Sequence, residues 1–314
     1  GTFLPMAGAT LLSALLRCRE KPRLPLYASI AAALLNTGLN YILIFGELGF
    51  APMGAKGAAI ATVISQWGNF LLMLLMLPRD LFVRNKEDAQ GEGMARFRWG
   101  QYLSMLLPLL GCEALWSLGE NVYAAIYGRM GTAASAAMTL TNPVQGLVIG
   151  ALCGLSQAAG VIVGKRLGSG EPEGAFLAAK RLLVYGAAGA VIVSAAVVLC
   201  SGVYAELYQV DAAIKTMTRQ LLLAYALIAP FKVLNMILGG GILRSGGRTK
   251  YVMFIDMTGT WCFGVPLGLL GAFVWKLPVA GVYALLSLEE CVRLAISMAV
   301  FRRKKWMHRL QAGA

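Results

Sequence analysis

Long apolar runs, separated by short basic or Gly/Pro-containing segments, constrain the fold of this chain more than any other feature. A transmembrane helix needs about 20 mainly apolar residues, because it crosses roughly 30 Å of hydrocarbon at about 1.5 Å per residue. In the bilayer each backbone polar group must be bonded within the protein, which favours helices. We therefore predict an all-α, polytopic transmembrane helix bundle with spans over 25–46, 54–77, 101–128, 133–162, 175–203, 217–243, 251–273 and 279–301.

The first apolar run is shorter than these spans. It begins at Gly1 and lasts only to Leu16, and the chain has no initiator methionine. Because a complete span needs about 20 residues, we expect an N-terminally truncated chain that starts inside a helix.

The composition also points to a membrane protein. Only 14% of the residues are charged and 58% are hydrophobic, whereas a soluble domain carries roughly 25% charged residues. A net charge of +13 would suit nucleic-acid binding if the bases shared one soluble surface. Here they form short clusters between apolar runs, so we expect the lipid bilayer as a partner and no nucleic acid.

The distribution of lysine and arginine predicts an orientation in the membrane. One set of alternate loops holds 21 of the 28 lysines and arginines, at 17–23, 79–98, 165–181, 244–250 and 302–309, and the opposite loops hold 5. The positive-inside rule places the richer set in the cytoplasm. We therefore predict a multi-pass protein of the cell membrane with a cytoplasmic C-terminus.

Cysteine and histidine give no sign of a metal site or a disulfide framework. The six cysteines have no CxxC or CxxH spacing, and the single histidine, His308, lies in the basic tail. We expect free thiols that pack as small apolar side chains, no cofactor, and a monomer. No nucleophile–base pair or phosphate-binding loop appears either, so we do not expect an enzyme.

The charges that fall inside the apolar runs are the candidate functional residues. Glu113 lies fifteen residues after Arg98 and sixteen before Arg129, near the middle of its span, where an unpaired charge costs several kcal/mol. Pro108 precedes it by five residues and loosens the helix. Ser117 follows one turn later, and Glu120 lies roughly 10 Å further along the axis. We interpret Glu113 as a carboxylate that alternates between a coupling cation or proton and a cationic substrate; the alternative is a static ion pair.

Lys232 is at a similar depth, thirteen residues from Arg219 and twelve from Arg244. Opposite charges at one depth suggest a Glu113–Lys232 ion pair, either fixed for packing or displaced by substrate or proton. Asn235 lies one helical turn after Lys232, so we expect it to hydrogen-bond the charged groups whether the ion pair is formed or displaced.

Four further groups of polar residues are weighed against structural roles. Asp256 is only six residues from Lys250, so a base on a neighbouring helix or loop is its expected partner. Glu289, Glu290 and Arg293 have the spacing of a local helical ion pair. Asn142 and Gln145, beside Pro143, and Asn36 with Asn40 in an earlier span, either line a cavity or join helices.

Several blocks of the chain resemble the multidrug and toxic compound extrusion (MATE) family. The block LLNTGLNYILIFGELGFAPMGAKGAAIATVISQW (34–67) looks like its fifth and sixth helices, and LPLLGCEALWSLGENVYAAIYGRMGT (107–132) is similar to the seventh in a clostridial-type bacterial branch. Three later blocks resemble the tenth, eleventh and twelfth helices of the family, in that order: NMILGGGILRSGGRTK (235–250), WCFGVPLGLLGAF (261–273) and LEECVRLAISMAVFRRKKW (288–306).

The resemblance implies twelve helices in two pseudo-symmetric six-helix lobes, with the first three helices and part of the fourth absent here. Residues 1–77 would then be the remnant of the N-terminal lobe, 78–98 a cytoplasmic linker, 99–301 the C-terminal lobe, and 302–314 a basic cytoplasmic tail. It also implies export of small-molecule organic cations and drugs by alternating access, driven by Na⁺ or H⁺.

Two positions depart from the family pattern. Members often carry an acid in the tenth helix where this chain has Lys232, and the usual GDT after that helix is replaced by Gly247, Arg248 and Thr249. A flippase or exporter of lipid-linked or other metabolite cargo on a related fold is the alternative function. A channel or a non-transporting receptor would form a third class.

Overall fold

The computed structural model describes residues 1–19, 21–77, 99–247, 249–304 and 306–307. The chain separates into two compact units, Gly1–Arg96 (unit 1) and Phe97–Ala314 (unit 2). The expected linker, 78–98, lies outside the described residues, as do 308–314 of the expected tail.

Unit 1 consists of the helices α1 (Phe3–Cys18), α2 (Arg23–Phe45) and α3 (Ala55–Leu75) in the part that is described. The chain turns after α2 at Gly46, whose φ of 80° favours glycine. Gly57 lets α3 approach α2 closely, because a Cβ there would lie 2.5 Å from the carbonyl oxygen of Leu43. Small residues therefore set the α2–α3 contact, as is common between membrane helices.

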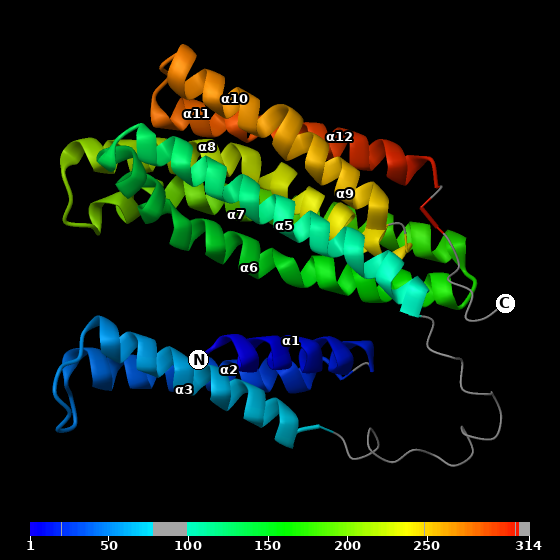
Figure 1. The fold of residues 1–314 in the computed structure, drawn as a ribbon, viewed down its shortest axis with the longest axis horizontal. Helices are drawn as coiled ribbons and strands as arrows, with labels where there is room; N and C mark the ends of the chain where they lie inside the picture. Colours follow the sequence, from blue (N-terminus) through cyan, green and yellow to red (C-terminus); the bar gives the residue numbers. More distant parts are fainter. Residues whose placement is uncertain (20, 78–98, 248, 305, 308–314) are drawn as a thin grey trace. The chain divides into compact units, whose positions relative to one another are not determined.

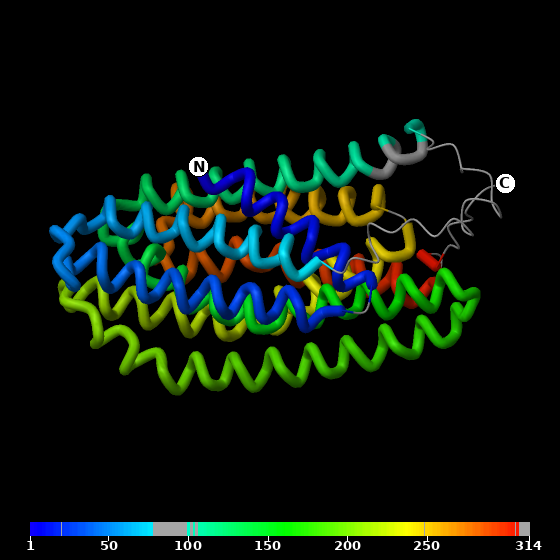
Figure 2. The backbone as a smooth tube through the Cα atoms, turned by 90° about the horizontal axis from the view of Figure 1, so that it is seen from below, coloured from blue at the N-terminus to red at the C-terminus, as the bar shows by residue number. Residues whose placement is uncertain are grey.

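Unit 2 begins with four long elements that run up and down beside one another (Figures 1 and 2). They are α5 (Trp99–Arg129), α6 (Thr132–Gly168), α7 (Pro172–Glu206) and α8 (Ala212–Asn235), and α8 continues as a π-helical segment, Met236–Leu243. Each of the four elements, with the π-helical continuation of α8 included, is longer than the span predicted for it. A proline lies inside each of α5, α6 and α8.

The last two spans of unit 2 are less regular than predicted. The first is assembled from α9 (Thr249–Met257), a π-helical segment (Thr258–Gly264), α10 (Val265–Leu269) and another π-helical segment (Leu270–Val274). The second is broken at Ser287 into α11 (Val279–Leu286) and α12 (Leu288–Arg302). The prediction of one continuous helix over 279–301 is therefore wrong.

Six elements of the described chain are long and apolar enough to cross a membrane: Arg23–Phe45, Ala55–Leu75, Thr132–Gly168, Pro172–Glu206, Ala212–Leu243 and Thr249–Val274. The first helix, Phe3–Cys18, is apolar but shorter. The all-α, multi-span fold class is thus confirmed, while the two remaining predicted spans correspond to α5 and to the interrupted pair α11 and α12.

Within unit 2 the α6–α7 connection, the α8–α9 connection, the start of α5 and the end of α12 lie at one end of the bundle (right in Figure 1). These are the connections that carry most of the bases of this unit. At the same end Trp306, which the sequence places in a basic tail, is 1% exposed and stacks on Phe301. The tail therefore contributes an apolar anchor as well as charge.

Two apolar clusters form the core of unit 2. One, nearer the basic end, includes Val163, Ile237 and Leu243; the other includes Ile126, Leu222 and Val282. Along the eighth helix the two clusters meet between Ala229, which belongs to the second, and Val233, which belongs to the first, and Lys232 lies between these two residues. Lys232 therefore lies where the two apolar clusters meet.

Candidate functional site

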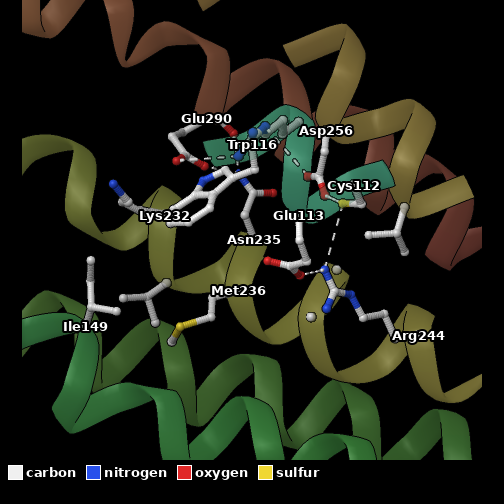
Figure 3. A pocket seen from close by; sticks show the side chains of 15 residues that line it. Cys112, Glu113, Trp116, Ile149, Lys232, Asn235, Met236, Arg244, Asp256 and Glu290 are labelled. Atoms are coloured by element: carbon white, nitrogen blue, oxygen red, sulfur yellow. Dashed lines mark hydrogen bonds and ion pairs between the residues drawn. The ribbon is translucent and has the colours of Figure 1, made fainter. Parts of the chain in front are cut away.

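Most of the intramembrane charges of unit 2 gather around one cavity of about 340 Å³ (Figure 3). Four predicted site residues line it: Glu113, Lys232, Asn235 and Asp256. Its lining also includes three charged residues that the sequence did not place in a site, Arg244, Glu290 and Arg293. The cavity thus lies between α5, α6, α8 with its π-helical continuation, α9 and α12.

Irregular backbone shapes the wall of this cavity. Pro108 lies inside α5, five residues before Glu113, and Pro230 lies inside α8, two residues before Lys232. A proline removes a helical hydrogen bond and disturbs the turn that precedes it. After Asn235 the helix becomes π-helical, and Gly239 and Gly240 of that segment line the cavity without a side chain. Such π-helical turns occur frequently at functional sites.

Glu113 is paired with Arg244, so the predicted ion partner, Lys232, is wrong. Arg244 Nη2 lies 3.1 Å from Glu113 Oε1, and the side chains are 33% and 58% exposed. The same guanidinium lies 3.9 Å from Cys112 Sγ, whose thiol donates to Asp256 Oδ2 at 2.9 Å. A chain of polar contacts therefore runs from Glu113 to Asp256 along one wall of the cavity (Figure 3).

Arg293 is the centre of a second, more buried group. Its Nη1 lies 3.8 Å from Glu290 Oε1 and its Nε 3.8 Å from Asp256 Oδ1, and its Nη2 donates to Thr260 Oγ1 at 2.6 Å. The side chains of Arg293 and Glu290 are 9% and 8% exposed. The local pair expected for α12 is therefore present, and Asp256 has the neighbouring-helix base that the sequence suggested.

Asn235 bonds Glu290 rather than Glu113 or Lys232. Its amide nitrogen donates to the backbone oxygen of Glu290 at 2.7 Å and to its Oε2 at 2.8 Å. This fixes the start of α12 against the eighth helix. Negative side chains at a helix N-terminus are also favoured by the helix dipole.

A smaller cavity of about 60 Å³ adjoins the first, because Lys232 and Glu290 line both. Glu120 and Gln145 line the smaller one, together with Tyr123 and Glu289. The Tyr123 hydroxyl donates to Glu289 Oε2 at 2.6 Å. Gln145 also donates to Thr141 Oγ1 at 3.1 Å, so it joins turns of α6 as well as facing the cavity.

The remaining predicted residues lie elsewhere. Ser117 and Asn142 are exposed and line neither of these two cavities. In unit 1, Asn36 donates to Ser65 Oγ at 3.0 Å and Asn40 donates to Asn36 Oδ1 at 3.0 Å. Asn36 thus joins α2 to α3, whereas Asn40 bonds within α2.

The sequence held one unused signal for the Glu290 region. Ser287, Leu288, Glu289 and Glu290 form an S-x-x-E pattern, which is typical of a helix start. Ser287 is indeed the residue before α12, although its side chain makes no capping bond. Because this pattern falls inside the predicted span 279–301, it could have predicted that the helix is interrupted there, with Glu289 and Glu290 at the interruption.

Potential metal ligands do not cluster in the described ranges, where no group of three or more His, Cys, Asp and Glu side chains could hold a metal ion. The carboxylates of the large cavity instead face arginines, as shown above for Glu113, Asp256 and Glu290.

Known proteins with similar sequences are multidrug resistance proteins. The chain is 30% identical over 257 residues to multidrug resistance protein MdtK of Yersinia pseudotuberculosis, which covers 79% of this chain and 54% of that protein. It is 26% identical over 317 residues to the probable multidrug resistance protein NorM of Mesorhizobium japonicum, covering 98% and 66%. The chain therefore spans about half of the length of MdtK.

Known structures share the fold. The eukaryotic MATE transporter AtDTX14 superposes with a TM-score of 0.79 at 20% identity, over 94% of this chain and 65% of that one. The MATE transporter ClbM, in complex with Rb⁺, gives 0.77 at 18% identity, over 98% and 67%. The MatE family profile matches residues 108–270, which is more than half of the chain. This range includes the cavity-lining residues from Glu113 to Asp256. The chain therefore belongs to the MATE family.

Proposed function

We propose that this protein is a secondary active antiporter that exports organic cations and drugs across the cytoplasmic membrane in exchange for Na⁺ or H⁺. The observation that carries the proposal is the carboxylate of Glu113, which lines a cavity within unit 2 and is held by one ion pair to Arg244. An intramembrane acid that lines a cavity is a functional-site hypothesis by default. The printed names of MdtK and NorM support drugs as cargo.

Coupling follows from competition for the Glu113 carboxylate. A proton would neutralise it and release Arg244, whereas a monovalent cation or a cationic substrate would take the place of the guanidinium. Because the carboxylate side chain is 58% exposed, a ligand can reach it without unpacking the core. Alternating access would then present this cavity to opposite sides of the membrane in turn. The Rb⁺ complex of ClbM supports a monovalent cation as one competitor.

The proposed topology follows the charge of the loops. The end of unit 2 that carries most of its bases would face the cytoplasm, which also places the C-terminus there. Residues 99–301 would form one lobe of the transporter and residues 1–77 would belong to the other, with 78–98 as the cytoplasmic linker between them. The protein would act as a monomer in a multi-pass membrane location, without a cofactor.

The test is dye export by cells that lack their own pumps and express the protein from its complete gene. Glu113→Gln keeps the size of the side chain and removes its charge, so we expect at least a tenfold loss of export at normal membrane levels. Glu206→Gln is the matched control, because Glu206 is also a glutamate in an ion pair, with Lys215 at 2.7 Å, but lies at the end of α7. Equal activity of the two variants would reject Glu113 as the coupling acid.

The coupling ion is determined in the same cells. If export by the wild type stops when Na⁺ is withdrawn, Na⁺ is the coupling ion. If export persists without Na⁺ and stops when the proton gradient is collapsed, it is H⁺.

Export or flipping of lipid-linked cargo is the alternative that one observation favours. Lys232, Arg244 and Arg293 all line the large cavity, and arginine is suited to phosphate. However, both guanidiniums face carboxylates of the same protein, which leaves Lys232 as the base for an anionic group. If the wild type exports no cationic dye, lipid-linked or other anionic cargo becomes the favoured substrate.

A further inference from the structure

Trp306 is buried although it follows a run of bases. Its side chain is 1% exposed, whereas Arg302, Arg303 and Lys304 before it are exposed. It belongs to the apolar cluster nearer the basic end of unit 2, which also contains Leu243 of the π-helical segment. Burial of so large an aromatic side chain contributes strongly to packing. The chain after α12 is therefore held against the bundle at this residue.

Contacts on both sides of Trp306 fix the turn that brings it back to the bundle. Its ring stacks on Phe301 with 5.7 Å between centroids, and Phe301 stacks on Phe176 of α7 with 4.8 Å. The indole N–H donates to the backbone oxygen of Phe301 at 3.1 Å. Lys304 has a φ of 55°, which is uncommon for residues other than glycine, and its Nζ lies 3.7 Å from Glu173 Oε1. The turn is thus tied to the start of α7.

The backbone of Trp306 contacts the connection between the eighth helix and α9. A Cβ at Gly246 would collide with the backbone oxygen of Trp306 and would lie 3.0 Å from its ring atom Cε3. Glycine is therefore required here as long as Trp306 stays in place. The connection is a tight turn, in which the Gly247 N–H donates to the Arg244 oxygen at 3.1 Å. A shift of Gly246 consequently moves Arg244, which lies two residues earlier.

Arg244 depends on this backbone because its guanidinium is weakly held. Among the described residues its one ion pair joins Nη2 to Glu113 Oε1 at 3.1 Å, and Nη2 lies 3.9 Å from Cys112 Sγ. Its Nε is buried and has no hydrogen-bond partner there. The pair thus lacks the two parallel hydrogen bonds that would orient a guanidinium by themselves. The position of the backbone then decides how well Arg244 meets Glu113.

We propose that Trp306 is a positioning residue for the Glu113–Arg244 ion pair: it packs on Gly246, holds the connection after the eighth helix, and so keeps Arg244 against Glu113. The inference rests on the proposed export function in treating this pair as the site of exchange. Without the Trp306 contact, Arg244 would leave Glu113 more often. A Trp306 that served the fold alone would stabilise unit 2 as a whole, and its loss would loosen every buried group alike.

The test is the reaction of the purified protein with phenylglyoxal, which modifies guanidinium groups, with the rate at each arginine followed by mass spectrometry. A released guanidinium reacts faster than a paired one, so the rate at Arg244 reports how often it leaves Glu113. We expect Trp306→Ala to raise this rate about 2- to 30-fold, the range in which such contacts change the coupling between sites. The rate at Arg293, in the other ion-pair group of the same cavity, should not change. Glu113→Gln gives the rate of the released side chain.

Three further variants separate positioning from stability. Trp306→Phe keeps a ring that can stack and should leave the rate at Arg244 close to that of the wild type. Gly246→Ala places a methyl group against the backbone of Trp306 and should raise the rate as Trp306→Ala does. Gly168→Ala is its control, because a Cβ at the end of α6 meets no atom within 4 Å. An unchanged rate at Arg244 in Trp306→Ala or Gly246→Ala, or an equal rise at Arg293, would overturn the proposal.

Dye export in cells distinguishes this failure from that of the proposed function. If the rate at Arg244 depends on Trp306 but the wild type exports no dye, the positioning role stands and the antiporter proposal fails. If the wild type exports dye but the rate does not depend on Trp306, the reverse holds. Where both proposals are correct, Trp306→Ala should lower the Na⁺ or H⁺ concentration that gives half-maximal export, because Arg244 competes less well for Glu113.

Discussion

Replacing Arg293 by glutamine should destabilise unit 2 far more than the loss of a shorter ion pair at the surface. The Arg293 side chain is only 9% exposed and lies 3.8 Å from both Glu290 and Asp256. Its guanidinium also donates to Thr260 at 2.6 Å. Glutamine is too short and too weak a donor to replace these contacts, so two carboxylates would lose their compensating charge.

The magnitude follows from the burial of this group. Removing one partner of a buried ion pair costs about 3–5 kcal/mol, because the other charge stays desolvated and uncompensated. For a domain of this size that corresponds to a fall in Tm of roughly 6–20 °C. Part of the loss should be recovered by adding Asp256→Asn, since this removes one of the two orphaned carboxylates. The double variant should therefore be more stable than Arg293→Gln alone.

The assay is thermal unfolding of the detergent-purified protein, followed by tryptophan fluorescence. The control is Lys215→Gln, which breaks the Lys215–Glu206 pair. That pair is shorter, at 2.7 Å, but Glu206 is 73% exposed, and such pairs contribute about 1 kcal/mol or less. If Arg293→Gln lowers Tm no more than Lys215→Gln does, or if Asp256→Asn adds to the loss, the cluster does not stabilise unit 2 in this way.

Two other substitutions probe packing and hydrogen bonding near the cavities. Gly241→Ala places a methyl group against the backbone oxygen of Ser156 and should destabilise the protein by about 1–3 kcal/mol through overpacking, measured as a lower Tm. Gly239→Ala is the control and should leave Tm nearly unchanged, because a Cβ at Gly239 would meet no atom within 4 Å. Equal effects of the two substitutions on Tm would contradict this explanation. Tyr123→Phe removes the 2.6 Å hydrogen bond to Glu289 and should cost about 1.5–3 kcal/mol in the same assay, whereas an unchanged Tm would show that the bond contributes nothing.

The existence and order of the helices could be predicted from apolar length alone, but their regularity could not. Hydropathy reports which residues tolerate hydrocarbon, and this is equally satisfied by α-helical and π-helical backbone. The π-helical segment Met236–Leu243 has the apolar sequence MILGGGIL, which contains nothing against a regular helix except its three glycines. The break at Ser287 is likewise hidden in an apolar run, where a serine and two glutamates were the only sign.

The estimated depth in the membrane predicted which residues share a cavity but assigned Glu113 the wrong partner. Counting residues from the basic flanks correctly brought Glu113, Lys232 and Asn235 to one cavity. The same counting treated Arg244 as a loop residue and so missed it. Residue counts estimate the depth of a Cα atom in the membrane, but not the position of the charge at the end of a long side chain. Arginine carries its charge several ångströms from its backbone, and here that reach brings it to Glu113.

The two ion-pair groups of the cavity differ in how easily each can change partners. Arg293 and Glu290 are more than nine-tenths buried and are tied to three helices and a π-helical segment, so separating them would leave charges without water or counter-charge. Glu113 and Arg244 are 58% and 33% exposed and meet in a single contact. Separation there should therefore cost less than at Arg293, because both charged groups are already partly exposed. An incoming cation or proton would therefore exchange at Glu113 first, while the Arg293 group keeps the frame of the cavity unchanged.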